Sequence, residues 1–180
     1  MPPRSMEKRK DAIDRPQKIR KVPKRVSSGT GLLEELNRLL DEVESFEANL
    51  HDAISFQVTG AGKVDRSLWR DSLSPPSYEA AVENIQSIRK CINYAADLEE
   101  LIVDPGPGEL LNRLFESLWW IQKICDCNRV LHYDSNLVRS VWRPAFTDRT
   151  LSVLQRYLQP SNKAFWSSLG DAWTQPRCVF

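Results

Sequence analysis

Apolar residues in the first half of this chain recur with the spacing of an α-helix. Between residues 32 and 54 they recur in steps of three or four, which places them along one face of a long helix. A stripe this narrow is typical of a helix that packs against other helices in a coiled-coil-like seam. The stripe consists of Leu32, Leu36, Leu39, Val43, Phe46, Leu50 and Ile54.

Two further long helices are predicted from the same periodicity. The second runs from about residue 78 to 103, and the third from 109 to about 125. Between them, Asp104 is followed by alternating proline and glycine at residues 105–108, which end a helix because proline lacks an N–H and glycine disfavours continuation. The buried face of the second helix is predicted as Ala81 or Val82, Ile85, Ile88, Ile92, Ala95 and Ile102. That of the third is predicted as Leu110, Leu111, Leu114, Phe115, Leu118 and Ile121.

Shorter helices are expected near residues 135–142, 147–158 and 161–169. Thr147 and Ser161 are suitable N-caps, and Gly170 is a suitable residue to stop the last helix. No stretch alternates for long with the period of two that marks a strand. The prediction is an all-α chain, with two long antiparallel helices, a third helix and several short C-terminal helices.

Charge divides the chain into a basic arm and a mildly acidic body. Residues 1–25 hold ten Lys or Arg against three Asp or Glu, a net +7, which leaves −6 for the other 155 residues. Four prolines and a Ser-Ser-Gly cluster interrupt residues 1–31, whose apolar residues show no helical period. We therefore expect a disordered basic arm over 1–31 and a helical domain over 32–177.

The arm has a bipartite arrangement of basic residues. A solvated linker is the first interpretation, followed by attraction to an anionic membrane surface. A nuclear import signal comes next and nucleic-acid binding last, because no aromatic residue for base stacking interleaves the charges. The residues concerned are Lys8, Arg9, Lys10, Lys18, Arg20, Lys21, Lys24 and Arg25.

Two short motifs are candidate contacts with protein partners. Pro75-Pro76-Ser77-Tyr78 fits Pro-Pro-x-Tyr, the polyproline II signal of WW domains. The favoured interpretation is a helix entry with Tyr78 in the core. Trp119 and Trp120 are adjacent and cannot easily share a helix face, so one of them is exposed, and we select Trp120 as the candidate contact. The remaining late aromatics are assigned mainly to the core: Trp119, Trp142, Phe146, Phe165, Trp166 and Trp173.

Chemistry-bearing constellations are sparse. Cys125, Cys127 and His132 fall short of the four ligands of a structural zinc site. The chain has two histidines and neither of the common glycine-rich phosphate loops. We predict no catalytic residue, no cofactor, no metal site and no small-molecule substrate. Four cysteines in 180 residues, no secretory h-region and no apolar run near 20 residues favour an intracellular chain with reduced thiols.

Four stretches resemble the middle region of the epidermal growth factor receptor kinase substrate eight family of signalling adaptors. Residues 36–46 (LNRLLDEVESF) look like its first "hydrophobic, Asp-Glu, aromatic" helix, and residues 75–78 look like its Pro-rich lead into a second helix. Residues 111–115 (LNRLF) fall where the family has Leu-x-x-x-Leu-Phe. Residues 165–173 (FWSSLGDAW) are similar to its Leu-Trp-x-Ser-Leu-Gly-x-x-Trp, and are the most specific of the four.

The resemblance covers about residues 32–177 and implies a spectrin-like helical region. In the family this region lies between a phosphotyrosine-binding domain and a Src-homology 3 domain, neither of which falls within these 180 residues. It implies a non-enzymatic scaffold that couples receptor tyrosine kinases to Rho/Rac and actin, with signalling and actin-regulatory proteins as partners. The expected location is the cytoplasm, at the plasma membrane or cell cortex. The alternative is a basic-tailed nuclear or nucleic-acid-binding helical protein.

Overall fold

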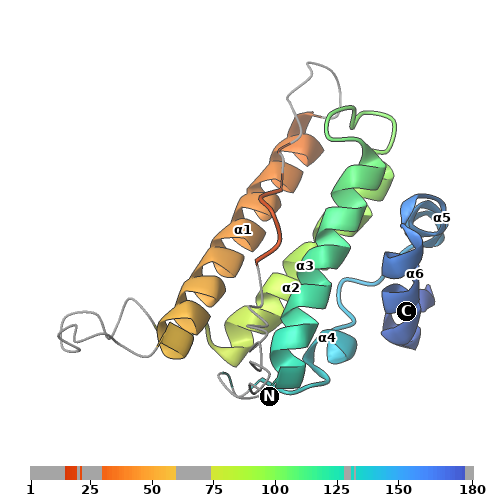
Figure 1. The fold of residues 1–180 in the computed structure, drawn as a ribbon. Coiled ribbons are helices and arrows are strands. Elements are labelled where there is room, and N and C mark those ends of the chain that lie inside the picture. Colours follow the sequence, from red (N-terminus) through yellow and green to blue (C-terminus); the bar gives the residue numbers. More distant parts are fainter. Residues whose placement is uncertain are drawn as a thin grey trace, which may run out of the picture.

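Three long helices form the body of the protein. The computed structural model describes residues 15–19, 21, 30–59, 74–127, 131 and 133–176, and this part of the chain holds helices and no strand. Helices α1 (Thr30–Thr59), α2 (Tyr78–Asp97) and α3 (Pro107–Cys127) run down, up and down again as neighbours in the view of Figure 1. The prediction of an all-α fold with two long antiparallel helices and a third is confirmed.

Four shorter helices follow α3. They are α4 (Leu137–Ser140), α5 (Asp148–Tyr157), α6 (Pro160–Ser168) and α7 (Asp171–Thr174). They lie against α2 and α3, on the side away from α1, so α2 and α3 are covered from both sides (Figure 1). The C-terminal third thus forms a second layer on the bundle.

The predicted apolar faces are largely those that are buried. All six inward residues of α3 are completely buried, as are Ile85, Ile88, Ile92 and Ala95 of α2. Ala81 rather than Val82 is the fully buried member of its pair. The start of the α1 stripe was predicted wrongly, because Leu33 is buried and Leu32 is exposed. A helix turns about 100° per residue, so the face drifts by one position at this end.

Helix α2 ends earlier than its apolar pattern suggests. Its last helical residue is Asp97, and the prediction that it continues to residue 103 is wrong. The N–H groups of Leu101 and Ile102 both bond to the carbonyl of Leu98, at 2.8 and 3.1 Å, which tightens the chain into a turn. This turn keeps Ile102 in the core while it leads the chain towards α3.

The ends of the short helices were predicted with mixed success. The Oγ1 of Thr147 accepts a hydrogen bond from the N–H of Thr150 at 3.1 Å, which confirms it as an N-cap. Ser161 is not a cap, because α6 already begins at Pro160, whose fixed φ suits a first helical position. Gly170 has a φ of +85°, a conformation that favours glycine, which confirms it as the stop after α6. The short helix α7 was not predicted.

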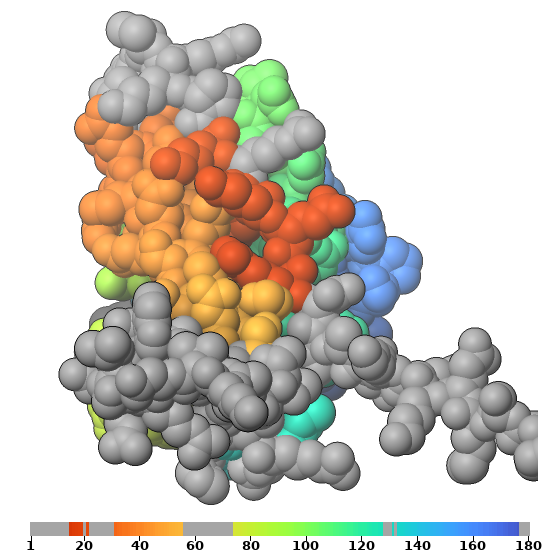
Figure 2. All heavy atoms as spheres, turned by 60° about the vertical axis from the view of Figure 1, so that its left-hand side comes forward, coloured from red at the N-terminus to blue at the C-terminus, as the bar shows by residue number. Residues whose placement is uncertain are grey.

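The N-terminal strap, defined as residues 15–19 and Lys21, is extended and lies along α1 (Figure 2). Ile19 is only 2% exposed and joins the core. The expectation of a disordered arm is corrected for this segment, because burying one large apolar side chain offsets part of the entropy cost of ordering it. The boundary near residue 32 stays a prediction, and most of the remaining arm lies outside the described residues.

Candidate protein-binding surface

The adjacent tryptophans of α3 point in opposite directions. Trp120 is 2% exposed and belongs to the core, whereas Trp119 is 45% exposed. The choice of Trp120 as the partner contact is therefore wrong, and so is the assignment of Trp119 to the core. The physical reason is that Trp120 lies about one helical turn from the buried residues Ser117 and Ile124, on a face of α3 that other parts of the fold cover. The candidate contact is Trp119.

Trp119 borders a groove of about 260 Å³ between α3 and α6. Phe165, which is half-buried, supplies a second ring from α6, and Glu116 lies one turn before Trp119 on α3. The Lys123 ammonium lies 3.7 Å from the centre of the Trp119 ring, a cation–π contact that holds the side chain of the lysine over the indole. We call this groove between α3 and α6, together with Lys123 over the indole of Trp119, the Trp119 groove.

A buried amide network fixes the floor of the Trp119 groove. Asn112 Oδ1 accepts hydrogen bonds from the Gln159 N–H at 2.8 Å and from Asn162 Nδ2 at 2.9 Å. Its Nδ2 donates to the carbonyls of Tyr157, at 2.9 Å, and Gly108, at 2.7 Å. One α3 side chain therefore ties down both the end of α5 and the start of α6. This network keeps the groove in one shape, which lowers the entropy cost of binding.

In the Pro-Pro-x-Tyr motif, Pro76 and Ser77 form hydrogen bonds within the fold, whereas the Tyr78 side chain is exposed. Tyr78 is 43% exposed, so the interpretation that its ring lies in the core is wrong. Ser77 caps α2, since its Oγ accepts from the N–H of Ala80 at 3.1 Å, and this confirms the helix entry. The Pro76 carbonyl accepts a hydrogen bond from the Tyr133 hydroxyl. Pro75 and Pro76 are half-buried, so binding by a WW domain stays a prediction.

The charged residues of the strap pair with acidic residues of α1. Lys21 Nζ lies 2.7 Å from Asp41 Oδ1, and Lys18 Nζ lies 3.7 Å from Glu44 Oε2. Arg15 donates from Nη2 to the Glu44 carbonyl at 3.0 Å. The positive charges of the strap therefore interact with acidic side chains and a carbonyl of α1, within the same protein. The other predicted arm residues, Lys8, Arg9, Lys10, Arg20, Lys24 and Arg25, lie outside the described residues.

Glu47 is the most buried carboxylate beneath the strap. It is 1% exposed, and burial raises its pKa, although Ser117, Arg15 and Arg113 act in the opposite direction. Arg15 Nε lies 4.0 Å from Glu47 Oε2, too far for a strong hydrogen bond. The charge of Glu47 is thus incompletely compensated.

The two cysteines at the end of α3 lie in different environments. Cys125 is buried, and burial raises the pKa of its thiol to about 12, whereas Cys127 is exposed. His132 lies outside the described residues. Within residues 15–19, 21, 30–59, 74–127, 131 and 133–176, no group of three metal-ligating side chains gathers. In the same part of the chain, no helix has the length and apolar content to cross a bilayer.

Comparison with known proteins decides the family. Residues 32–180 match the model of the EPS8 spectrin-like domain. The chain belongs to the EPS8 family. The expected resemblance and the spectrin-like fold are therefore confirmed, and the EPS8 family is one of signalling adaptors.

Curated EPS8 relatives agree with this assignment. Human epidermal growth factor receptor kinase substrate 8-like protein 2 is 29% identical over 152 residues, which cover 79% of this chain and 20% of the relative. The human 8-like protein 1 is 30% identical over 151 residues, covering 78% and 20%. Mouse epidermal growth factor receptor kinase substrate 8 is 26% identical over 154 residues, covering 79% and 18%. The chain thus spans about a fifth of these EPS8 proteins, and no solved structure matches it.

Proposed function

We propose that this chain is a non-enzymatic scaffold module that acts by binding other proteins in receptor tyrosine kinase signalling to Rho/Rac and the actin cytoskeleton. The observation that carries the proposal is the exposed Trp119, held over a fixed groove, in a member of a family of signalling adaptors. Exposed tryptophans at preformed grooves are typical anchors of protein interfaces.

The chemistry of the described surface supports binding over catalysis. The Trp119 groove offers two aromatic rings, a lysine and a glutamate, which suit an apolar anchor flanked by charges. We place the module in the cytoplasm, at the plasma membrane or cell cortex, with signalling and actin-regulatory proteins as partners. Within the strap, the pairing of Lys18 and Lys21 with α1 favours a structural role over the nucleic-acid-binding alternative.

The test uses the Rac response of epithelial cells to epidermal growth factor. Cells would express the full chain fused to a fluorescent protein, and Rac-GTP would be measured by effector pull-down before and after stimulation. We expect the chain to change the Rac-GTP rise and to collect at the cortex. Trp119→Glu should abolish the change in Rac-GTP, because a charge at the anchor opposes burial at an interface.

Trp142 provides a matched control. The assignment of Trp142 to the core is wrong, because this tryptophan is 39% exposed. The Arg143 guanidinium lies 4.4 Å from its ring centre, and the residue lies outside the Trp119 groove. Trp142→Glu should leave the Rac-GTP response intact. The proposal fails if the natural chain leaves Rac-GTP unchanged, or if both substitutions have the same effect.

A further inference from the structure

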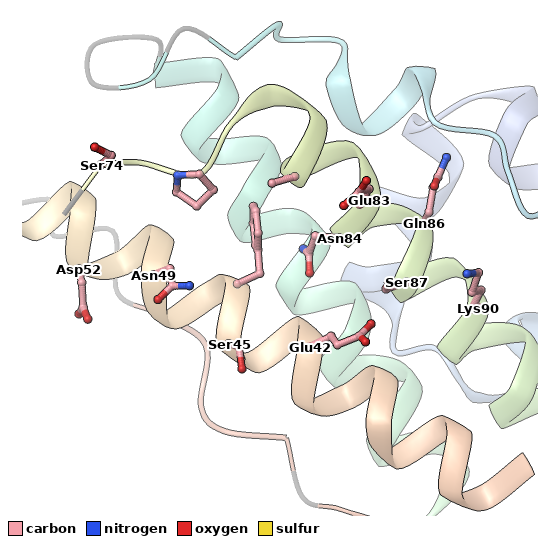
Figure 3. A pocket seen from close by; sticks show the side chains of 13 residues that line it. Glu42, Ser45, Asn49, Asp52, Ser74, Glu83, Asn84, Gln86, Ser87 and Lys90 are labelled. Atoms are coloured by element: carbon pink, nitrogen blue, oxygen red, sulfur yellow. The ribbon is translucent and has the colours of Figure 1, made fainter. Parts of the chain in front are cut away.

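A second groove lies on the opposite side of the bundle, between α1 and α2. Its volume is about 810 Å³, and polar side chains make up most of its wall (Figure 3). Glu42, Asn49 and Asp52 face it from α1, and Glu83, Asn84 and Lys90 face it from α2. We call it the α1–α2 groove. It shares no residue with the Trp119 groove, which α3 and α6 form.

Asn84 is the unusual residue of the α1–α2 groove. Its side chain extends from α2 towards α1 (Figure 3), and the residue is only 5% exposed. Neither its Nδ2 nor its Oδ1 has a hydrogen-bond partner in the part of the chain that the structure describes. A buried polar group without a partner lowers the stability of the fold. Asparagine is also a poor helix former at a central helix position. Stability alone does not account for this residue.

The chemistry of the Asn84 amide defines what would complement it. The group offers one acceptor oxygen and one donor nitrogen in a single plane. In an extended peptide, the N–H and C=O of one residue point to the same side of the strand. The amide can therefore bond to both groups of that residue, in the manner of one residue of a neighbouring strand. A backbone recognised in this way requires no particular side chain at that residue.

The charges of the α1–α2 groove select a basic peptide. The wall of the groove contains three carboxylates, those of Glu42, Asp52 and Glu83, and one ammonium, that of Lys90. Glu42 also forms an ion pair with Arg38, whose guanidinium is shared with Glu35. An excess of negative charge remains along the walls. Charge complementarity of this kind steers encounter and excludes partners of the same sign.

We propose that the α1–α2 groove binds an extended basic segment of a partner protein, with the Asn84 amide hydrogen-bonded to the N–H and C=O of one of its residues. This goes beyond the proposed role of the Trp119 groove, because the two grooves lie on different helices. A variant that lost binding at one groove would retain binding at the other.

Fluorescence polarisation tests the proposal with a defined probe. The probe is a fluorescein-labelled peptide of four Thr-Lys repeats, whose β-branched threonines favour the extended form. The full chain should bind it saturably, and binding should weaken as salt rises. A Thr-Glu peptide, and the Thr-Lys peptide with every backbone nitrogen methylated, should not bind.

Asn84→Leu is the decisive variant. Leucine has a similar size and no hydrogen-bonding group, so the variant should unfold at the same or a higher urea concentration than the natural chain. Its affinity for the Thr-Lys peptide should fall at least tenfold. Gln155→Leu, an exposed amide on α5, controls for the loss of an amide elsewhere and should leave affinity unchanged. Glu83→Lys should lower the affinity for the Thr-Lys peptide, and it should also make that affinity less dependent on salt.

Several results would overturn the proposal. One is the absence of Thr-Lys binding at about 1 mM, the weak end of measurable affinity. Another is equal binding by the natural chain and Asn84→Leu. A third is binding only by a chain that begins at Arg15, which would assign the groove to the protein's own N-terminal residues. A loss of the Trp119 effect on Rac-GTP leaves all of these readouts untouched.

Discussion

The guanidinium of Arg89 lies 4.3 Å from the centre of the Trp173 ring. The two residues are far apart in the sequence, since Ala172, which precedes Trp173, is 83 positions after Arg89. Arg89 is completely buried and packs between Trp173 and Phe146, the latter at 4.1 Å. It donates hydrogen bonds to the carbonyls of Pro144, at 2.8 Å, and Ala172, at 3.0 Å. One residue of α2 therefore fastens the C-terminal layer to the bundle.

Arg89→Met should destabilise the protein by about 3 kcal/mol or more, since it leaves buried carbonyls without donors and removes two cation–π contacts. Arg89→Lys should restore little, because an ammonium cannot reproduce the planar set of donors. Urea unfolding gives the free energy, and hydrogen exchange should rise most in residues 141–176. A loss below about 1 kcal/mol would show that the C-terminal layer is held by other contacts.

Trp166 and Trp119 should differ strongly in their effect on stability. Trp166 is buried and donates from Nε1 to the Trp173 carbonyl at 2.7 Å. Trp166→Ala should cost about 3–5 kcal/mol, as expected for a core aromatic. Trp119→Ala should stay within about 1 kcal/mol, because the ring is largely exposed. Thermal and urea unfolding of both variants would check this, and equal losses would contradict the placement of the pair.

Glu47 predicts a pH-dependent difference between two variants. Burial raises its pKa above the ordinary value of 4.5, so the folded state binds the proton more tightly than the unfolded state. The associated stabilisation is complete below about pH 4.5 and is lost as pH rises through the folded pKa. Glu47→Gln should therefore be more stable than the natural chain at pH 7, and the advantage should shrink as pH falls towards 4.5.

Urea unfolding across that pH range measures the difference, with the exposed Glu100→Gln as a control that should show none. A Glu47→Gln chain that is less stable at pH 7 would mean that Arg15 and Arg113 outweigh the cost of burial.

Ile19 should contribute to stability although it precedes the first helix. Ile19→Ala should cost about 2 kcal/mol, the lower end for a buried isoleucine, because the strap lies at the edge of the core. Gln17→Ala, two residues away and exposed, should change the free energy of unfolding by less than about 0.5 kcal/mol. If the two variants unfold alike, the strap does not hold Ile19 in solution.

Features that depend on spacing along one helix were predictable. The buried faces of α2 and α3 follow from apolar periodicity, and the roles of Thr147 and Gly170 follow from local backbone chemistry. The earlier end of α2 was not predictable in this way, because Ile102 is buried in the turn and therefore continues the apolar pattern of the helix.

Features that depend on packing between distant segments were missed. Sequence alone requires that Trp119 and Trp120 diverge, but which one is exposed depends on where α4–α7 cover α3. Arg89 appears as one more charged residue on an amphipathic helix until Phe146 and Trp173 are brought against it. The burial of Asn84 could not be predicted either, because the sequence alone does not distinguish a buried asparagine from a solvent-exposed one.

The most direct test of the account places a photo-crosslinking amino acid, benzoylphenylalanine, at position 119 and separately at position 142. Cells expressing each full chain would be stimulated with epidermal growth factor and illuminated, and the cross-linked products analysed by immunoblot and mass spectrometry. We expect a discrete product containing a signalling or actin-regulatory protein from position 119, and none from position 142. The same products from both positions, or none from position 119, would contradict it.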